Sequence, residues 1–312
     1  MTVRIAPHRG AATTHALVSA VVGDATLAAV SATDVTILLS GVDAGVDTGS
    51  GTDLLDSATT DSVLVVGADD PHLSPIADGF PGRVLRVGYA STHDVSVDSV
   101  DATLDGTTIV AVVAGERVTV ALPLIGERHV LAALAALAAG IALGIAPATA
   151  ASALGAVTDR EPGNLELLPT RAGITILDDS YDASALSTTE ALKTLAEITP
   201  VGRRSIAVLG ALSGIEGDPR EEHDRIGRIV VRLNIALLIA IGSGARHLQA
   251  AAGLEGSWDG ESVLVATADE AYDLLRAEIR ESDIVLVKTD PTVLHSNGGT
   301  HTLGQRLGRL YA

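Results

Sequence analysis

The chain has 312 residues, enough for two hydrophobic cores, and carries a formal net charge of −18. A negative field of this size repels phosphate backbones and anionic lipids, so we expect no nucleic-acid partner and no membrane partner. The absence of cysteine excludes disulfides and thiolate metal sites. It fits a reducing compartment, and the N-terminus lacks the pattern of a signal peptide, so a cytoplasmic protein is expected.

The first residues have the order of a phosphate-binding site. Residues 2–6 are predicted to form a strand, residues 7–14 a loop, and residues 11–22 a helix. Strand, loop and helix in this order frame many phosphate-binding loops. Without further information, a structural turn between strand and helix is the default interpretation.

The rest of the first half predicts a sheet covered by helices. Strands are expected at 34–39, 62–66 and 83–87, and the alternation over 95–122 predicts an antiparallel group. The apolar residues 131–151 predict two buried helices rather than a membrane span, because Pro147 interrupts them and charged residues precede them.

His129, just before this apolar stretch, is a candidate general base. The alternative is an exposed helix cap or a residue at the edge of the core.

Residues 159–163 are predicted to link two domains, 1–158 and 159–312. From residue 205 onward, strands and helices alternate, which predicts a parallel sheet covered on both faces. We therefore expect an α/β fold in both domains, with a Rossmann-like arrangement in the second.

The stretch 173–184 contains the strongest candidate site. An apolar strand ends in Asp178 and Asp179, where ligands of parallel sheets usually bind. The two carboxylates could bind Mg²⁺ or act in acid–base chemistry. The alternative is that they cap the loop, with one carboxylate in solvent. A helix is predicted to follow, capped by Ser184 or by Ser187 in a capping box.

Asp178-Asp-Ser-Tyr181 followed by a helix resembles the Asp-Asp-Ser-Tyr-Asn-Ala-Asn-Pro signature of Mur ligases. Gly67-Ala-Asp-Asp-Pro71 also resembles the family's Asn-Ala-Asp-Asp-Pro, whose carboxylates are expected to cap the next helix. The most similar branch adds D-alanyl-D-alanine to a UDP-muramoyl tripeptide. The resemblance spans residues 2–312. It implies a trimmed central domain of the phosphate-loop type, followed by a Rossmann-like C-terminal domain.

Several working residues of that family are replaced. Its phosphate loop reads Gly-x-x-Gly-Lys-Thr-Thr, of which Gly10 and Thr13 remain. The replacements in this loop are Pro7, Ala11 and Ala12. The first lysine of the chain is Lys193, so the carbamylated metal-bridging lysine of the family is also missing. Each lost phosphate-stabilising group typically costs roughly 10²-fold in rate.

The leading hypothesis is therefore a catalytically degenerate Mur-ligase-like protein that needs no cofactor and has no metal site. It would act in a cell-wall or peptide-ligation pathway through a protein partner or as a homo-oligomer. The resemblance leaves a vestigial phosphate loop with a possible stacking ring, namely His8, Arg9, Gly10, Thr13 and Tyr181.

Two alternatives stay open. One is an amide ligase that uses ATP and Mg²⁺ in a rebuilt site, for which the candidates are Asp178, Asp179, Tyr181, His129 and Lys288. The other is a protein that binds a small molecule in the cleft between its domains.

Overall fold

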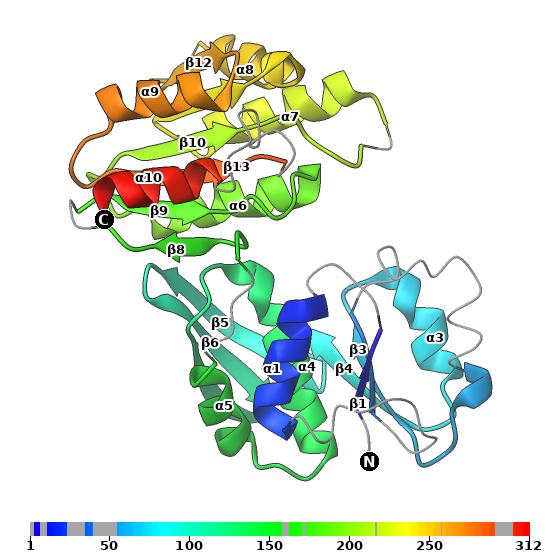
Figure 1. Cartoon of the computed structure of the whole chain (residues 1–312). Coiled ribbons are helices and arrows are strands. Elements are labelled where there is room, and N and C mark those ends of the chain that lie inside the picture. The colour runs from blue at the N-terminus through cyan, green and yellow to red at the C-terminus, as the bar shows by residue number, and fades with distance from the viewer. Residues whose placement is uncertain are drawn as a thin grey trace. The chain divides into compact units, whose positions relative to one another are not determined.

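The chain folds into two compact units, Met1–Asp159 and Arg160–Ala312, each with its own sheet (Figure 1). The computed structural model describes residues 3–6, 11–23, 35–39, 55–157, 162–170, 173–215, 217–256, 258–290 and 302–312. The predicted linker begins among residues outside this description. Both units mix helices and strands, which confirms the predicted α/β class.

The described residues of the first unit form a seven-stranded sheet in simple sequence order. Its strands are β1 (Val3–Ile5), β2 (Val35–Leu38), β3 (Val63–Gly67), β4 (Arg83–Gly88), β5 (Val95–Thr103), β6 (Gly106–Val113) and β7 (Glu116–Leu122). Neighbours from β1 to β5 are parallel, whereas β5, β6 and β7 pair antiparallel. The predicted antiparallel group is therefore confirmed.

Helices cover both faces of this sheet. The helical elements whose bounds lie within the described residues are α1 (Ala11–Val22), η2 (Pro71–Leu73), α3 (Ser74–Gly79), η3 (Glu127–His129), α4 (Val130–Ala142) and α5 (Pro147–Gly155). The main core lies between the sheet and α1, α4 and α5, and a smaller core lies beneath α3 on the other face. As predicted, a carboxylate begins the helical turn η2, because Asp70 accepts a hydrogen bond from the His72 amide at 2.9 Å.

Helix α4 is the centre of this core, and most of its buried side chains are alanine. Small side chains let neighbouring helices approach closely. A Cβ added at Gly140 would come within 2.7 Å of Val21 on α1. The predicted pair of buried helices is confirmed as α4 and α5. Within the described residues, no helix combines the length and apolar character needed to cross a membrane.

In the second unit, the part that the structure describes forms a six-stranded sheet in the order β12-β11-β10-β13-β9-β8. Its strands are β8 (Glu166–Leu168), β9 (Thr175–Asp178), β10 (Ser205–Leu209), β11 (Leu237–Ile241), β12 (Glu261–Val265) and β13 (Ile284–Lys288). All neighbours are parallel except the edge strand β8, which runs antiparallel to β9.

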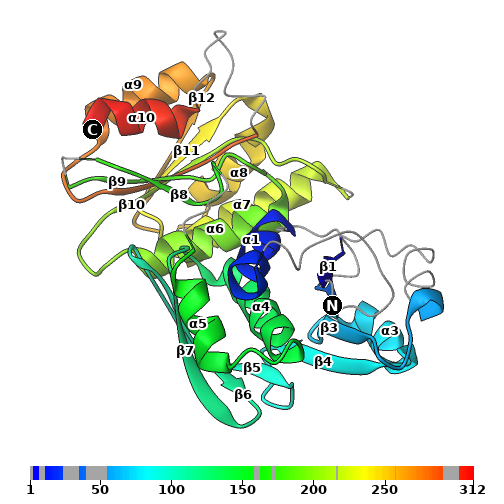
Figure 2. The ribbon, with the colours of Figure 1, turned by 60° about the horizontal axis from the view of Figure 1, so that its bottom comes forward.

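Helices lie on both faces of the second sheet, as the alternating pattern predicted (Figure 2). They are α6 (Ala185–Ile198), α7 (Pro219–Arg232), η4 (Ser243–Ala245), α8 (Arg246–Gly253), α9 (Ala268–Glu278) and α10 (Leu303–Tyr311). Helices α9 and α10 pack on one face, and α6, α7 and α8 on the other (Figure 2). The carboxyl ends of the parallel strands therefore meet at one edge of the sheet, between two helical layers.

We predict that Leu137→Ala lowers the free energy of unfolding of the first unit by about 2–5 kcal/mol. Leu137 is fully buried in α4, and most of the other buried side chains of this helix are alanines, which are too short to fill the space it would leave. Leu131→Ala on the same helix is the matched control. Leu131 is only half-buried, so this substitution should cost less free energy of unfolding. Urea denaturation followed by circular dichroism measures both. Equal losses would contradict the central role of this side chain.

Candidate functional site

Three predicted site residues lie together at the carboxyl edge of the second sheet. Asp178 ends β9, Asp179 follows it, and Lys288 ends the neighbouring strand β13. The parallel register places Asp178 beside Val287, so the two strands end side by side. All three side chains are buried, with at most 2% of their surface exposed. The expectation that one of the two carboxylates lies in solvent is therefore wrong.

Lys288 and Asp179 form a buried ion pair. The Lys288 ammonium donates to Asp179 Oδ2 at 2.6 Å and to the main-chain oxygen of Asp182 at 2.7 Å. The other carboxylate oxygen, Asp179 Oδ1, accepts from the Leu165 amide at 3.0 Å. The pair therefore joins the end of β13, the loop after β9 and the residue before β8. These contacts occupy both groups, so neither is placed as a free general base or phosphate-binding cation.

Asp178 is tied instead to helix α10. Its Oδ2 accepts a hydrogen bond from the hydroxyl of Thr302, the residue that caps α10. Helix and carboxylate are so close that a Cβ at Gly304 would come within 2.8 Å of the Asp178 carboxyl carbon. Burial raises the pKa of the Asp178 carboxyl, and nearby Glu166 adds to this, whereas hydrogen bonds from Thr302 and Ser180 oppose it.

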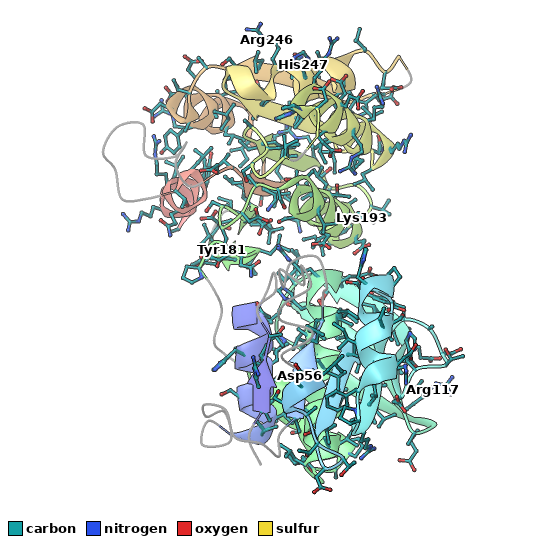
Figure 3. The ribbon with its side chains drawn as sticks, turned by 90° about the vertical axis from the view of Figure 1, so that its right-hand side faces the viewer. Asp56, Arg117, Tyr181, Lys193, Arg246 and His247 are labelled. Atoms are coloured by element: carbon teal, nitrogen blue, oxygen red, sulfur yellow. The ribbon has the colours of Figure 1, made fainter. Side chains whose placement is uncertain are left out.

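The loop after these aspartates presents an aromatic ring. The Tyr181 side chain is 61% exposed, and its position on the second unit is shown in Figure 3. The Tyr181 amide donates to the Gly163 oxygen at 2.9 Å, which fixes the backbone beneath the ring. Ser184 caps α6 by accepting from the Ser187 amide at 3.3 Å. Of the two predicted caps, Ser184 is therefore the correct one.

A second loop supports this one. The Ser213 amide, in the glycine-rich loop after β10, donates to the Ala183 oxygen at 2.9 Å. The Leu212 amide donates to Nε2 of His223 on α7 at 3.0 Å. Ser213 and His223 are not among the site residues predicted from the sequence. One sequence signal indicates them: the glycine-rich loop 210–217 is followed by a helix that carries a histidine in its second turn.

The remaining candidates belong to the first unit. His129 is buried at the start of α4 and its side chain makes no capping hydrogen bond, so the exposed-cap interpretation is wrong. Thr13 lies in the first turn of α1 and is half-buried. His8, Arg9 and Gly10 lie outside the described residues. Within the described part of the chain, no group of three or more His, Asp or Glu side chains is placed to hold a metal ion.

Comparison with known proteins gives the family. A model described as the Mur ligase glutamate ligase domain matches residues 163–290, from the loop bonded to Tyr181 to just beyond Lys288. The UDP-N-acetylmuramoyl-tripeptide–D-alanyl-D-alanine ligase of Mycobacterium leprae is 33% identical over 268 residues. The chain belongs to the Mur ligase family.

This alignment covers 78% of this chain and 52% of the M. leprae relative. The ligase of the same name from Mycobacterium bovis is 35% identical over 243 residues, covering 72% of this chain and 48% of that relative. The chain thus spans about half the length of the curated relatives it matches.

Solved structures share the fold. MurF from Thermotoga maritima, in complex with ADP, matches 94% of this chain and 77% of its own, with a TM-score of 0.72 at 15% identity. MurF from Acinetobacter baumannii matches 79% of this chain and 52% of its own, with a TM-score of 0.65 at 21% identity. These likenesses establish the architecture of the family.

We predict that Asp179→Ala lowers the free energy of unfolding of the second unit by about 3–5 kcal/mol, because the Lys288 ammonium would stay buried without its counter-ion. The double variant Asp179→Ala with Lys288→Met should lose less than Asp179→Ala and Lys288→Met added together. The single tryptophan, Trp258, lies in the second unit and reports its unfolding in urea.

Glu222→Ala is the control for this prediction. It removes a more exposed ion pair, Arg225–Glu222, in the same unit and should change stability by no more than about 1 kcal/mol. Equal losses of unfolding free energy from Asp179→Ala and Glu222→Ala would contradict the stabilising role of the buried ion pair.

The stability of the folded protein should depend on pH through Asp178. Because the pKa of Asp178 is raised on folding, its neutral form stabilises the protein at low pH, and this contribution is lost as pH rises through the folded-state pKa. Asp178→Asn keeps an acceptor for Thr302 without a charge. Its melting temperature should exceed that of the wild type at pH 8, and the difference should shrink on acidification. A difference that grows on acidification would contradict the assignment.

Proposed function

We propose that the chain acts in peptidoglycan-precursor synthesis as an ATP-dependent carboxylate–amine ligase of the Mur family. The observation that carries this proposal is the 33% identity with a tripeptide D-alanyl-D-alanine ligase across 78% of the chain. That span is too long to come from the C-terminal domain alone, because residues 160–312 make up less than half of the chain. The similarity therefore extends into the first unit.

The described geometry changes which residues such a ligase would use. Lys288 and Asp179 neutralise one another in the protein interior, and Asp178 is bound to Thr302. We therefore assign these residues a structural role, in which they support a surface that binds a ligand, rather than a catalytic role in a rebuilt site. The exposed Tyr181 ring is the part of this surface that is open to a ligand.

The phosphate chemistry then falls to the first unit. Strand β1 and helix α1 flank residues 7–10, which is the frame that the predicted phosphate loop requires. Arg9 precedes Gly10, and a guanidinium binds phosphate through paired hydrogen bonds. We propose that Arg9 supplies the positive charge that the absent lysine would provide. We also propose that Thr13, the residue after Ala12, supplies the hydroxyl for Mg²⁺. Bound ATP would supply the phosphoryl group that activates a carboxylate.

The second candidate is the non-catalytic relative. Ala11 at the position of the family's lysine favours it, as does the absence of lysine before Lys193. Such a protein would associate with an active ligase, form a homo-oligomer or bind a small molecule without turning over ATP.

Calorimetric titration with ATP and Mg²⁺, followed by an ADP-release assay, separates the two candidates. The amine acceptor tested is D-alanyl-D-alanine, and the carboxylate substrate is UDP-muramoyl tripeptide. The ligase proposal predicts micromolar binding and acceptor-dependent ADP release. Arg9→Ala should reduce the release rate by roughly 10²-fold, whereas Arg83→Ala, which changes an exposed arginine of β4, should not. Absence of ATP binding by the folded chain would favour the non-catalytic relative.

A further inference from the structure

His223 is a buried histidine whose two ring nitrogens both face main-chain groups. Only 5% of its surface is exposed. Its Nε2 lies 3.0 Å from the Leu212 amide, and its Nδ1 lies 2.6 Å from the Pro219 oxygen. An amide can only donate, so Nε2 must accept and be unprotonated. The carbonyl oxygen can only accept, so Nδ1 carries the proton. The surroundings therefore select one neutral tautomer.

This ring is held on a rigid support. Helix α7, which carries it, begins at the capping residue Asp218 and packs closely on α8. A Cβ added at Gly227, one turn after His223, would come within 2.4 Å of the Leu248 oxygen. The close contact leaves little freedom for α7 to shift, so the position of the imidazole is set by the helix packing.

From this support, hydrogen bonds run to the loop that carries Tyr181. Leu212 is bound to the imidazole, and the next amide, Ser213, donates to the Ala183 oxygen at 2.9 Å. Ser213 and Ser184 also form a parallel β-bridge. On the far side, the Lys288 ammonium holds the Asp182 oxygen at 2.7 Å. Residues 182–184 are thus held by Lys288 from one side and by the His223-supported loop from the other.

We propose that His223 is a positioning residue for the ligand surface around Tyr181. Its Nδ1-protonated tautomer fixes the 210–215 loop, and that loop fixes residues 182–184, directly after the exposed ring. This inference rests on the proposed function only in taking the Tyr181 surface as a ligand site. A histidine that merely satisfied two local main-chain groups would leave the Tyr181 loop unaffected by its removal.

Three variants test the proposal. His223→Leu removes both ring contacts. His223→Gln places a side-chain amide oxygen near the position of Nε2, where it can accept from Leu212. His247→Leu changes an exposed histidine of α8, which is labelled in Figure 3, and is the matched control.

The first measurements are made on the free protein and need no activity. In wild type, ¹⁵N spectra of the imidazole should show a protonated Nδ1 and an unprotonated Nε2. In His223→Leu, hydrogen exchange should accelerate about tenfold or more at Leu212 and Ser213, and also across residues 181–184. His223→Gln should restore most of this protection, and His247→Leu should behave as wild type.

A proton on Nε2 would overturn the proposal. So would faster exchange that stops at Leu212 and Ser213 without reaching residues 181–184. If His223→Leu fails to fold, the imidazole spectrum and the exchange pattern of His223→Gln, compared with wild type, still decide it.

The ADP-release assay adds the functional arm. Where turnover is present, His223→Leu should raise KM for ATP or for the acceptor by about tenfold with little change in kcat, since a positioning residue acts on binding. A fall in kcat with KM unchanged would contradict the positioning role. Absence of turnover in the wild type counts against the ligase proposal alone, because the exchange and tautomer measurements do not depend on it.

Discussion

The second unit depends on one buried ion pair, Lys288 with Asp179. Removing an ammonium and a carboxylate from water costs several kcal/mol for each ion, and their attraction offsets this only where further hydrogen bonds complete the geometry. Here the Asp182 oxygen and the Leu165 amide provide those bonds. The pair consequently draws three chain segments to one point at the carboxyl edge of the sheet. The same contacts leave neither charge available to a ligand.

Under the proposed function, the two units have different roles. In the second unit, Lys288 and His223 hold the loop of residues 182–184 from opposite sides, and Tyr181 is left exposed beside it. Under the same proposal, we assign the charge for phosphate chemistry to the first unit, where Arg9 is the candidate. The replacements in the phosphate loop and the frame of the second unit are therefore compatible with the proposed ligase function.

Much of the fold could be predicted from the sequence because its signals are local. Residues 173–177 are a mostly apolar run that overlaps β9, and the alternation after residue 205 predicts the alternating strands and helices that are observed there. The burial of both Asp178 and Asp179 could not be predicted in this way. The partner of Asp179 lies 109 residues further along the chain, and only the parallel pairing of β9 with β13 brings Lys288 to it. His129 and His223 were equally hidden, because packing against distant helices decides whether a histidine is buried.

The central claim is that Lys288 is a buried structural cation. The chain has only two lysines, and Lys193 is exposed on α6 (Figure 3), so one experiment compares them directly. The folded protein is treated with an amine-reactive reagent, and the modified residues are identified by mass spectrometry. The account predicts rapid modification of Lys193 and none of Lys288 until the protein is unfolded. Modification of Lys288 at a rate similar to that of Lys193 in the folded protein would contradict it.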